Sequence, residues 1–243
     1  MKDSAETSSL ASEAYGIVRE RIIRGELALG QVISRRKLAA ELGMSFLPVS
    51  EALLRLEFEG LLESRPRAGT RVRIPSPDDV RGHYVLREAL EMQSARLFAE
   101  VATARERAEL RKLAARVDAV SGQPDRRLYV VMHHKLHRRI AECTRCEVLC
   151  EAIEKSHALA SIWFCIMRQP SPDDPPARHQ ALVEALVQGD PDKAAEAMRQ
   201  HIAVGMQHTL EVLEPYFRMR TATGETFFRS EKKRKGQPAV LVP

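Results

Sequence analysis

Two short helical patterns separated by one glycine, within residues 34–60, constrain the fold more than any other stretch of this chain. Each pattern opens with a serine, Ser34 or Ser45, where a side chain can cap the first turn of a helix. Gly43 lies between the patterns, and glycine adopts the left-handed backbone conformation that ends one helix and redirects the chain into the next. The spacing therefore predicts a helix-turn-helix.

A hairpin pattern rich in arginine follows at once, over residues 61–73. A turn from Pro66 to Gly69 separates its two halves, and residues 27–33 supply a connector or short strand that can pair with them. The apolar spacing of residues 10–24 predicts a further helix that packs across the other two. Together these features indicate a winged DNA-binding unit.

The composition fits a soluble protein with two domains. The 243 residues are 44% hydrophobic and 29% charged, and no apolar run approaches the roughly 20 residues that a membrane-spanning helix needs. The start of the chain lacks the apolar core of a signal peptide, so we expect a cytoplasmic protein without a membrane partner. The net charge of +5 is compatible with a polyanionic partner such as DNA.

Helical periodicity continues through the second half of the chain. Ser76 can cap a helix, Pro77 suits its first turn, and the two aspartates that follow favour the positive end of the helix dipole. We predict helices at about residues 80–101, 103–120, 126–142, 146–168, 177–188 and 191–215. In the first of these we expect a buried apolar side formed by Val85, Leu86, Ala89, Leu90, Met92, Leu97 and Phe98.

The predicted fold class is mainly α. An N-terminal winged helix-turn-helix over residues 10–75 precedes a C-terminal all-α antiparallel helical bundle over residues 76–217. Residues 1–9 are predicted to be a disordered lead. The basic segment 218–243 has too little periodic apolar content to fold alone, so we expect a disordered tail.

The placement of the histidines is the second informative feature. His133 and His137 are four residues apart and share one helical face. His179 and His201 lie on two helices that the tight turn at residues 189–191 makes antiparallel, so imidazoles from three helices can converge. Spacing alone leaves a metal site and ordinary core or solvated histidines about equally open.

The residues of the winged unit resemble the GntR family of bacterial transcription regulators. The similarity follows residues 34–39, 42–45, 48–49, 51–53, 55–57 and 59–61, together with the glycine of the wing at Gly69. The helical half resembles the FCD ligand-binding domain of the FadR-like subgroup, whose first helix carries an Arg and Glu signature that Arg87 and Glu91 match.

This resemblance implies a divalent metal ion held by an Asp and three histidines, and a small organic acid held near the metal. The implied ligands are His137, His179 and His201, with His133 in place of the Asp, or alternatively His134. Four neutral imidazoles favour zinc or nickel and leave charge for a carboxylate effector to balance. The resemblance also implies that Arg87 contacts this effector.

The resemblance carries over only part of the family's DNA contacts. Phe46 and Ser50 stand where members often have arginines, so we expect an operator that differs from the usual site. Three alternatives remain open: larger contributions from the wing arginines, contacts of Phe46 and Leu47 with thymine methyl groups, or a Phe46 that packs under the helix start. The candidate DNA-binding residues are Arg35, Arg36, Ser45, Phe46, Leu47, Pro48, Ser50, Arg65, Arg67, Gly69 and Arg71.

The sequence thus predicts a homodimeric, effector-responsive regulator, expected to be a repressor, that binds a palindromic double-stranded operator. The linker at residues 75–79 is the expected place where effector binding changes the disposition of the winged units. One alternative is a metal-sensing regulator without an organic effector. A second is a helical metal-dependent hydrolase, with Glu142 or Glu184 as the general base.

Overall fold

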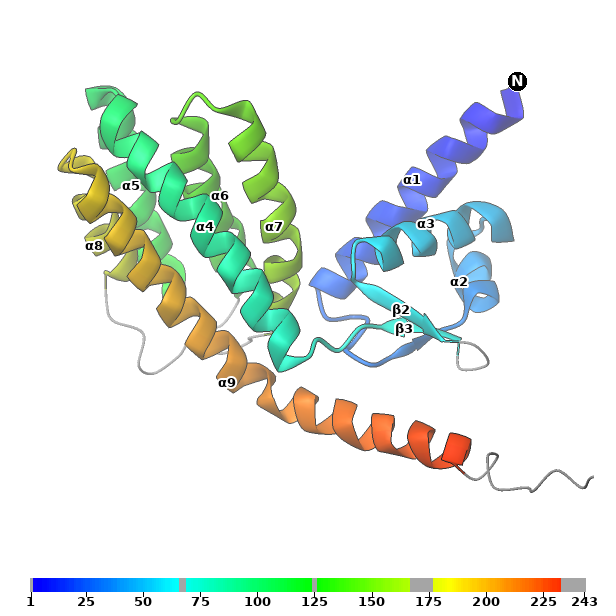
Figure 1. The fold of residues 1–243 in the computed structure, drawn as a ribbon. Coiled ribbons are helices and arrows are strands. Elements are labelled where there is room, and N and C mark those ends of the chain that lie inside the picture. The colour runs from blue at the N-terminus through cyan, green and yellow to red at the C-terminus, as the bar shows by residue number, and fades with distance from the viewer. Residues whose placement is uncertain (1, 66–68, 124–125, 167–176, 233–243) are drawn as a thin grey trace, which may run out of the picture.

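The computed structural model contains a winged N-terminal part and an all-helical C-terminal part (Figure 1). It describes residues 2–65, 69–123, 126–166 and 177–232, with side chains described for 10–65, 69–123, 128–157 and 177–219. The mainly α fold predicted from the sequence is confirmed. None of the helices in these ranges is long and apolar enough to cross a membrane.

The winged part combines three helices with a small antiparallel sheet. The strands lie in the order β1-β3-β2, so the residue 27–33 connector does contribute an edge strand to the predicted hairpin. The elements are α1 (Lys2–Ile23), β1 (Val32–Ile33), α2 (Arg35–Leu42), α3 (Phe46–Phe58), β2 (Leu62–Arg65) and β3 (Gly69–Val72).

The turn between α2 and α3 forms as its sequence dictates. The hydroxyl of Ser34 accepts a hydrogen bond from the backbone N–H of Lys37 at 3.3 Å, which caps α2. Gly43 ends that helix in the left-handed conformation with φ 65°, a backbone state that residues with a Cβ rarely adopt. Ser45 precedes α3 with an extended backbone. The predicted helix-turn-helix is therefore confirmed.

The core of the winged part lies between α1, α3 and the sheet. Val18 of α1 and Leu53 of α3 are fully buried, and truncation of such side chains to alanine typically costs about 2–5 kcal/mol. Other buried apolar residues of this core are Ala14, Ile22, Val49, Leu56, Leu62 and Val72.

The C-terminal part is a bundle in which α4 occupies a central position. This helix contacts α6, α7, α8 and α9, and its most extensive contact is with α9. Ser76 caps α4 as predicted, and a reciprocal capping box forms both there and at Thr103 before α5. The helices are α4 (Pro77–Val101), α5 (Ala104–Ser121), α6 (Arg126–Glu142), α7 (Glu147–Ile166), α8 (Arg178–Val187) and α9 (Pro191–Lys232).

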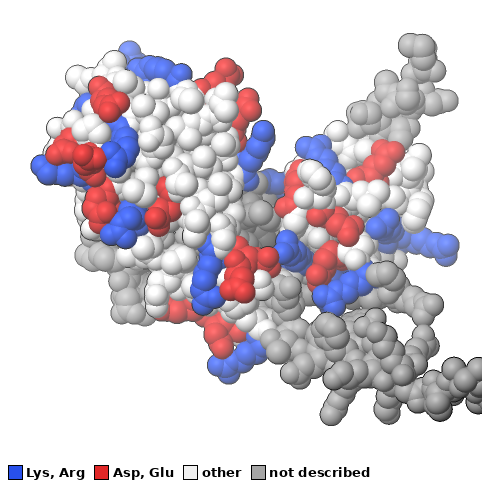
Figure 2. Space-filling view, viewed as in Figure 1, with Lys and Arg blue, Asp and Glu red and all other residues white. Residues whose placement is uncertain are grey.

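The apolar side of α4 faces outward, which contradicts most of the expectation from the sequence. Val85 is 67% exposed and Leu86 is 50% exposed, whereas Phe98 is buried as expected. The inward face is instead rich in polar groups, because Arg87 and Glu91 satisfy each other inside the bundle. Periodicity identifies an apolar face, but it does not show what covers that face. Figure 2 shows the corresponding uncharged, white surface over the helical part.

Both ends of the described chain are more helical than predicted. Helix α1 begins at Lys2, so the predicted disordered lead is wrong for residues 2–9. Those residues contain neither glycine nor proline, which disfavour helices. Their lack of apolar spacing means that this part of the helix has no apolar face to pack against the core, but it does not prevent a helix from forming. Helix α9 continues through Pro215 to Lys232, which contradicts the predicted disorder after residue 217, and Figure 1 shows it bending along its length. Residues 233–243 lie outside the described ranges.

Candidate metal centre and DNA-binding face

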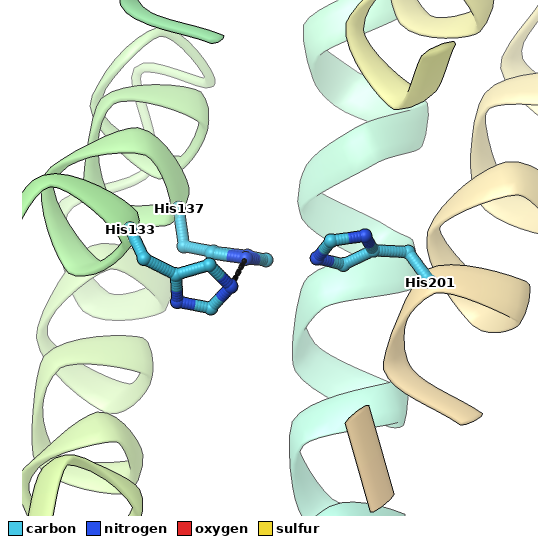
Figure 3. Close-up of side chains that lie close together, drawn as sticks. All are labelled: His133, His137 and His201. Carbon is cyan, nitrogen blue, oxygen red and sulfur yellow. Dashed lines mark hydrogen bonds between the residues drawn. The ribbon is translucent and has the colours of Figure 1, made fainter. Parts of the chain in front are cut away.

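Three buried histidines meet inside the helical bundle. His133 and His137 project from successive turns of α6, and His201 projects toward them from α9 (Figure 3). One ring nitrogen of each lies within 4.8 Å of the others. The spacing of the α6 pair and the antiparallel arrangement of α8 and α9 thus bring together the residues that the sequence suggested.

The distance between the two α6 imidazoles fits a shared ion. Nε2 of His133 lies 3.2 Å from Nε2 of His137. With zinc–nitrogen bonds of about 2.0–2.1 Å, two ligand nitrogens on one ion lie roughly 3.0–3.4 Å apart, depending on the coordination geometry. A hydrogen bond between the two rings would account for the same distance, so the remaining nitrogens of the cluster decide between the two.

Two further ring nitrogens have no hydrogen-bond partner in the described part of the chain. They are Nδ1 of His201 and Nε2 of His179, and both are buried. The ring centroid of His179 is 5.1 Å from those of His133 and His201, so the fourth predicted ligand lies beside the group formed by the other three. A buried polar atom left unpaired costs about 1–3 kcal/mol, and an ion bound at Nε2 of His179 would relieve that cost for this atom. The donor set therefore fits a divalent metal.

Asp118 of α5 holds His179 in place. Its carboxylate lies 2.6 Å from Nδ1 of His179, and it also accepts the backbone N–H groups of His179 and Gln180 at 3.1 and 2.9 Å. Helix α8 has no side-chain cap of its own, because Ala177 precedes it in a left-handed conformation with φ 61°. Asp118 thus caps α8 from another helix and directs Nε2 of His179 toward the cluster. The sequence analysis missed this residue, since it is far from His179 along the chain.

Glu91 of α4 holds His137 in a similar way. Oε2 of the Glu91 carboxylate lies against Nδ1 of His137, which leaves Nε2 of that ring facing the cluster. Nε of Arg87 donates to Oε1 of Glu91 at 2.8 Å, and Nε2 of His157 lies 2.9 Å from the same oxygen. Metal-bound histidines typically have a carboxylate on the ring nitrogen that does not bind the metal. Two of the four candidate ligands have this arrangement.

A second group, Glu91, His137 and His157, also brings potential ligand atoms within 4.8 Å of one another. The guanidinium of Arg87 occupies the same carboxylate oxygen as His157, so a cation there would be repelled. We therefore interpret this group as a hydrogen-bonded network around one ion site. His134 stacks on His157 with centroids 5.1 Å apart, away from the cluster. The geometry thus favours His133 over His134 as the fourth ligand.

Burial holds three histidines of the cluster, His133, His179 and His201, in the neutral form that binds metals. Burial lowers the pKa of His133 and of His201 well below the usual value, and neighbouring histidines and Arg178 lower both further. Burial also lowers the pKa of His179, although its hydrogen bond to Asp118 opposes that change. Burial acts to raise the pKa of Glu91, but Arg87 and His137 outweigh it, so the carboxylate stays ionised.

The candidate DNA-binding residues of α2 and α3 are partly exposed and partly buried. Arg36 and Ser45 are exposed, Phe46 is 52% exposed, and Leu47 is 59% exposed. Phe46 therefore does not pack under the helix start, which was one of the three alternatives. Pro48 and Ser50 are buried, the latter at 8% exposure, so these two predicted contacts do not face solvent. They lie on the side of α3 that packs on the core, which the family pattern alone did not reveal.

The arginines around the wing are largely paired. Arg35 donates to the Thr70 hydroxyl at 3.1 and 3.3 Å, so it connects α2 to β3. Arg71 forms a 2.6 Å ion pair with Glu63, and Arg65 lies 3.7 Å from the same carboxylate. Gly69 opens β3 with φ 79°. Arg67 lies outside the described residues. Figure 2 shows acidic side chains interspersed among the basic ones on this face of the winged part.

Comparison with known families decides what kind of protein this is. The FCD domain model matches residues 83–204, and the model for bacterial regulatory proteins of the gntR family matches residues 10–72. The chain belongs to the GntR family. The resemblance inferred from the motifs is therefore confirmed, and the protein is a transcription regulator, not an enzyme.

Curated relatives of this GntR regulator extend over most of its length. The probable D-xylose utilization operon transcriptional repressor of Paenarthrobacter nicotinovorans is 31% identical over 83% of this chain and 89% of its own. The transcriptional repressor RspR of Escherichia coli K12 is 24% identical over 81% of this chain and 87% of its own. The hydrolase alternative finds no support among these relatives.

Solved structures share the fold of the regulator. A GntR transcriptional regulator from Rhodococcus sp. RHA1 superposes with a TM-score of 0.69 at 22% identity, over 84% of this chain and 99% of its own. McbR/YncC of E. coli gives a TM-score of 0.62 at 22% identity, over 86% of this chain and 98% of its own. At this identity the similarity concerns the arrangement of the two parts, and it says nothing about ligands.

Two arginines lie near the histidine cluster of the GntR regulator, and they differ in how accessible they are to a bound carboxylate. Arg87, the predicted effector contact, is 2% exposed and bonded to Glu91, so an internal carboxylate already balances its charge. Arg178 precedes His179, is partly exposed, and donates to the Tyr129 hydroxyl at 3.2 Å. Its charge contributes to the low pKa of three cluster histidines. Sequence reasoning missed Arg178, although its position next to a candidate ligand was a usable signal.

Proposed function

We propose that this GntR regulator is a repressor that binds a palindromic operator as a homodimer, and that its helical part binds a divalent metal ion and a small carboxylate effector. Zinc or nickel suits the four imidazoles better than calcium or magnesium does. His133, His137, His179 and His201 would hold the ion. Both curated relatives described above are named as repressors, which supports the direction of regulation.

One observation carries the metal proposal: three buried histidines have ring nitrogens within 4.8 Å of one another, His179 packs beside them, and carboxylates contact the far nitrogens of His137 and His179. Arg87 balances the charge of Glu91, so Asp118 supplies the remaining negative charge beside the cluster, less than a divalent ion carries. A bound divalent ion would therefore attract an anion to its open positions. The charge of Arg178 at the N-terminus of α8 supports the same preference for a carboxylate.

The route from the cluster to the DNA-binding part would run along α4. Glu91 of this helix contacts His137, and the N-terminal cap of the helix begins at Ser76. Asp79 in that cap forms a 2.8 Å ion pair with Arg73 at the end of the wing. A shift of Glu91 on ligand binding would thus reach the winged part through a continuous helix, which is a physical basis for coupling between two sites.

A second candidate is a metal sensor without an organic effector. The engagement of Arg87 by Glu91 favours it, because the arginine expected to hold an effector carboxylate is already neutralised. In that function, metal alone would change operator affinity, and added carboxylates would change nothing further.

Metal titration with the full chain separates these proposals. Chelated protein should bind about one zinc per chain by competition with a chromogenic chelator, and His137→Ala with His201→Ala should remove that binding. His208→Ala is a matched control, since this histidine lies on α9 outside the cluster. Unchanged zinc binding in the double variant would refute the site. Operator affinity with zinc, before and after adding a panel of small carboxylates, then distinguishes an effector-binding repressor from a metal sensor.

A further inference from the structure

A pocket lies where the winged part of the regulator meets the helical part. Helix α1 contacts α7 there, and the cavity beside this contact measures about 500 Å³. Figure 1 shows α7 as the helix of the bundle that faces α1 and α3. Pockets of roughly 300–1,000 Å³ at domain interfaces are typical sites for small molecules. The residues that line this pocket, which we call the junction pocket, include Tyr15, Arg19, Phe58, Leu61, Glu154 and Lys155.

Apolar side chains form one wall of the junction pocket. Phe58, the last residue of α3, is 94% exposed, whereas Leu61, which also lines the pocket, is buried. Exposure of an aromatic ring is unfavourable in water, because its large apolar surface contacts solvent instead of protein. An occupant with an apolar body of its own would cover this ring.

Tyr15 forms a second, rigid wall that joins α1 to α3. Its hydroxyl donates to the Glu59 carboxylate at 2.7 Å, and the guanidinium carbon of Arg55 lies 3.9 Å from the centre of its ring. Nε of Arg55 also donates to Glu59 at 3.3 Å. Glu59 lines the pocket too, and these two donors already satisfy its carboxylate.

The charge that remains available in the junction pocket is positive. Its other carboxylate, Glu154, forms a 2.9 Å ion pair with Arg138. Arg19 has no hydrogen bond or ion pair among the residues whose side chains the structure describes. Lys155 lies 3.7 Å from Glu151 in an exposed pair, and exposed pairs contribute little. Two cations are therefore free to meet an anionic group of a ligand.

We propose that the junction pocket binds a small molecule with an apolar body and one anionic group, such as a carboxylate. The apolar body lies against Phe58 and Leu61, and the anionic group meets Arg19. None of the residues that line this pocket belongs to the histidine cluster. The inference therefore adds a second ligand site and goes beyond the proposed function.

An occupant of the junction pocket contacts both parts of the regulator. Phe58 ends the same helix that exposes Phe46 and Leu47 at its start, and Lys155 belongs to α7 of the bundle. A ligand between them connects the helix of the candidate DNA contacts to the helical part. Operator affinity should therefore depend on occupancy of the pocket.

Displacement of a fluorescent apolar anion tests the chemistry of the pocket. The full chain, with zinc present, should bind about one molecule of anilinonaphthalene sulfonate per pocket, and phenylbutyrate should displace it. Neutral phenylbutyramide should compete at least about 10-fold more weakly, because only the carboxylate gains a charged partner in Arg19. Failure of phenylbutyrate to displace the dye, or equal competition by the acid and the amide, would overturn the proposal.

Two variants locate the binding site. Arg19→Gln should weaken phenylbutyrate binding at least about 10-fold and make the acid and the amide equal, and Phe58→Ala should weaken both compounds about 5-fold. Phe58 is exposed and Arg19 has no partner among the described side chains, so both variants should keep the fold. Arg105→Gln on α5 and Val131→Ala on α6 are the matched controls. Wild-type affinity for phenylbutyrate in either pocket variant would contradict the site.

The outcomes also separate the junction pocket from the proposed metal site. The His137→Ala, His201→Ala variant should bind phenylbutyrate like the wild type, whether or not it binds zinc. Loss of phenylbutyrate affinity in that variant alone would assign the ligand to the cluster and overturn the junction pocket. Saturating phenylbutyrate should change the operator affinity of the wild type at least about 5-fold, but not that of Arg19→Gln. An operator affinity that phenylbutyrate leaves unchanged would refute the link between the pocket and α3.

Discussion

Carboxylates orient the key imidazoles of this regulator. Asp118 fixes His179 through its ring and its backbone N–H, and Glu91 fixes His137 from the opposite side of the bundle. Each carboxylate determines which ring nitrogen is left to face the cluster. In the proposed site, the geometry of the ligands would thus be set by residues that do not themselves bind the ion.

Asp118→Asn should weaken zinc binding about 10- to 100-fold, because an amide cannot replace the carboxylate as partner of the His179 ring. Chelator competition measures this affinity. Asn still accepts backbone hydrogen bonds, so the metal-free protein should unfold within a few degrees of the wild type.

A merely structural role for Asp118 would give a different pattern. Thermal stability of the metal-free variant would then fall strongly while zinc affinity stayed at the wild-type value. Asp192→Asn, an exposed change at the start of α9, is the control and should affect neither property.

Acid should destabilise the metal-free protein well before its carboxylates titrate. Burial lowers the pKa of His83 to about 4, with Arg87 adding to the effect, and burial lowers that of His157 to about 3. Both values lie below the unfolded value near 6.5, so the unfolded state binds more protons and stability falls as the pH drops below about 6.5. Each histidine should contribute about 2 kcal/mol of lost unfolding free energy between pH 7 and pH 5.

Urea unfolding in the presence of chelator at pH 5, 6 and 7 measures this loss. The variant His83→Gln should show a shallower dependence on pH than the wild type. An unfolding free energy that stays constant over this range would contradict the buried, neutral state of these two histidines.

At the scale of elements, α4 shows what the sequence could and could not determine. The residues of its apolar stripe were recognisable from spacing, but their exposure was not, because the pairing of Arg87 with Glu91 makes a polar side suitable for burial. The same limit applies to Asp118, whose role depends on two helices meeting in space. The caps and the glycine turn were predictable because they depend on neighbours in the chain.

Arg36 is the basic residue of α2 best placed to contact a phosphate, since it is exposed and has no ion pair among the described residues. Arg36→Ala should weaken operator binding and lower the slope of log affinity against log salt by about one. Fluorescence anisotropy at several salt concentrations measures both quantities. Arg105→Ala, on α5 and paired with Glu109 among the described residues, should leave both unchanged. An equal loss in the two variants would contradict a local role for Arg36.

The ion pair of Arg73 with Asp79 links the wing to the start of α4. Arg73→Ala should leave zinc affinity unchanged but reduce the effect of zinc on operator affinity, because the pair is far from the cluster and lies between the two parts. Arg81→Ala, which breaks only the neighbouring contact with Asp78, is the matched control. Coupling of wild-type size in Arg73→Ala would show that the signal travels another way.

At the scale of the whole molecule, the two-part fold and the family followed from local motifs, and the comparisons confirm both. The four histidines were identified from spacing and resemblance, and the bundle brings three of them together with the fourth, His179, packed beside them. The DNA-binding residues were less predictable. Pro48 and Ser50 are buried against the core, and Arg71 of the wing forms an ion pair with Glu63. We therefore expect the operator preference to depend on the exposed start of α3, where Phe46 and Leu47 are accessible and Phe46 stands where members often have an arginine.

The affinity of the full chain for an operator enriched from a random duplex library, with and without zinc at one salt concentration, tests the central claim most directly. The proposal predicts a two-fold symmetric enriched sequence whose affinity changes about 5- to 150-fold on chelation, with no change for unrelated duplexes. A chain that enriches no sequence, or that binds its operator equally well with and without zinc and in the His137→Ala, His201→Ala variant, would contradict it.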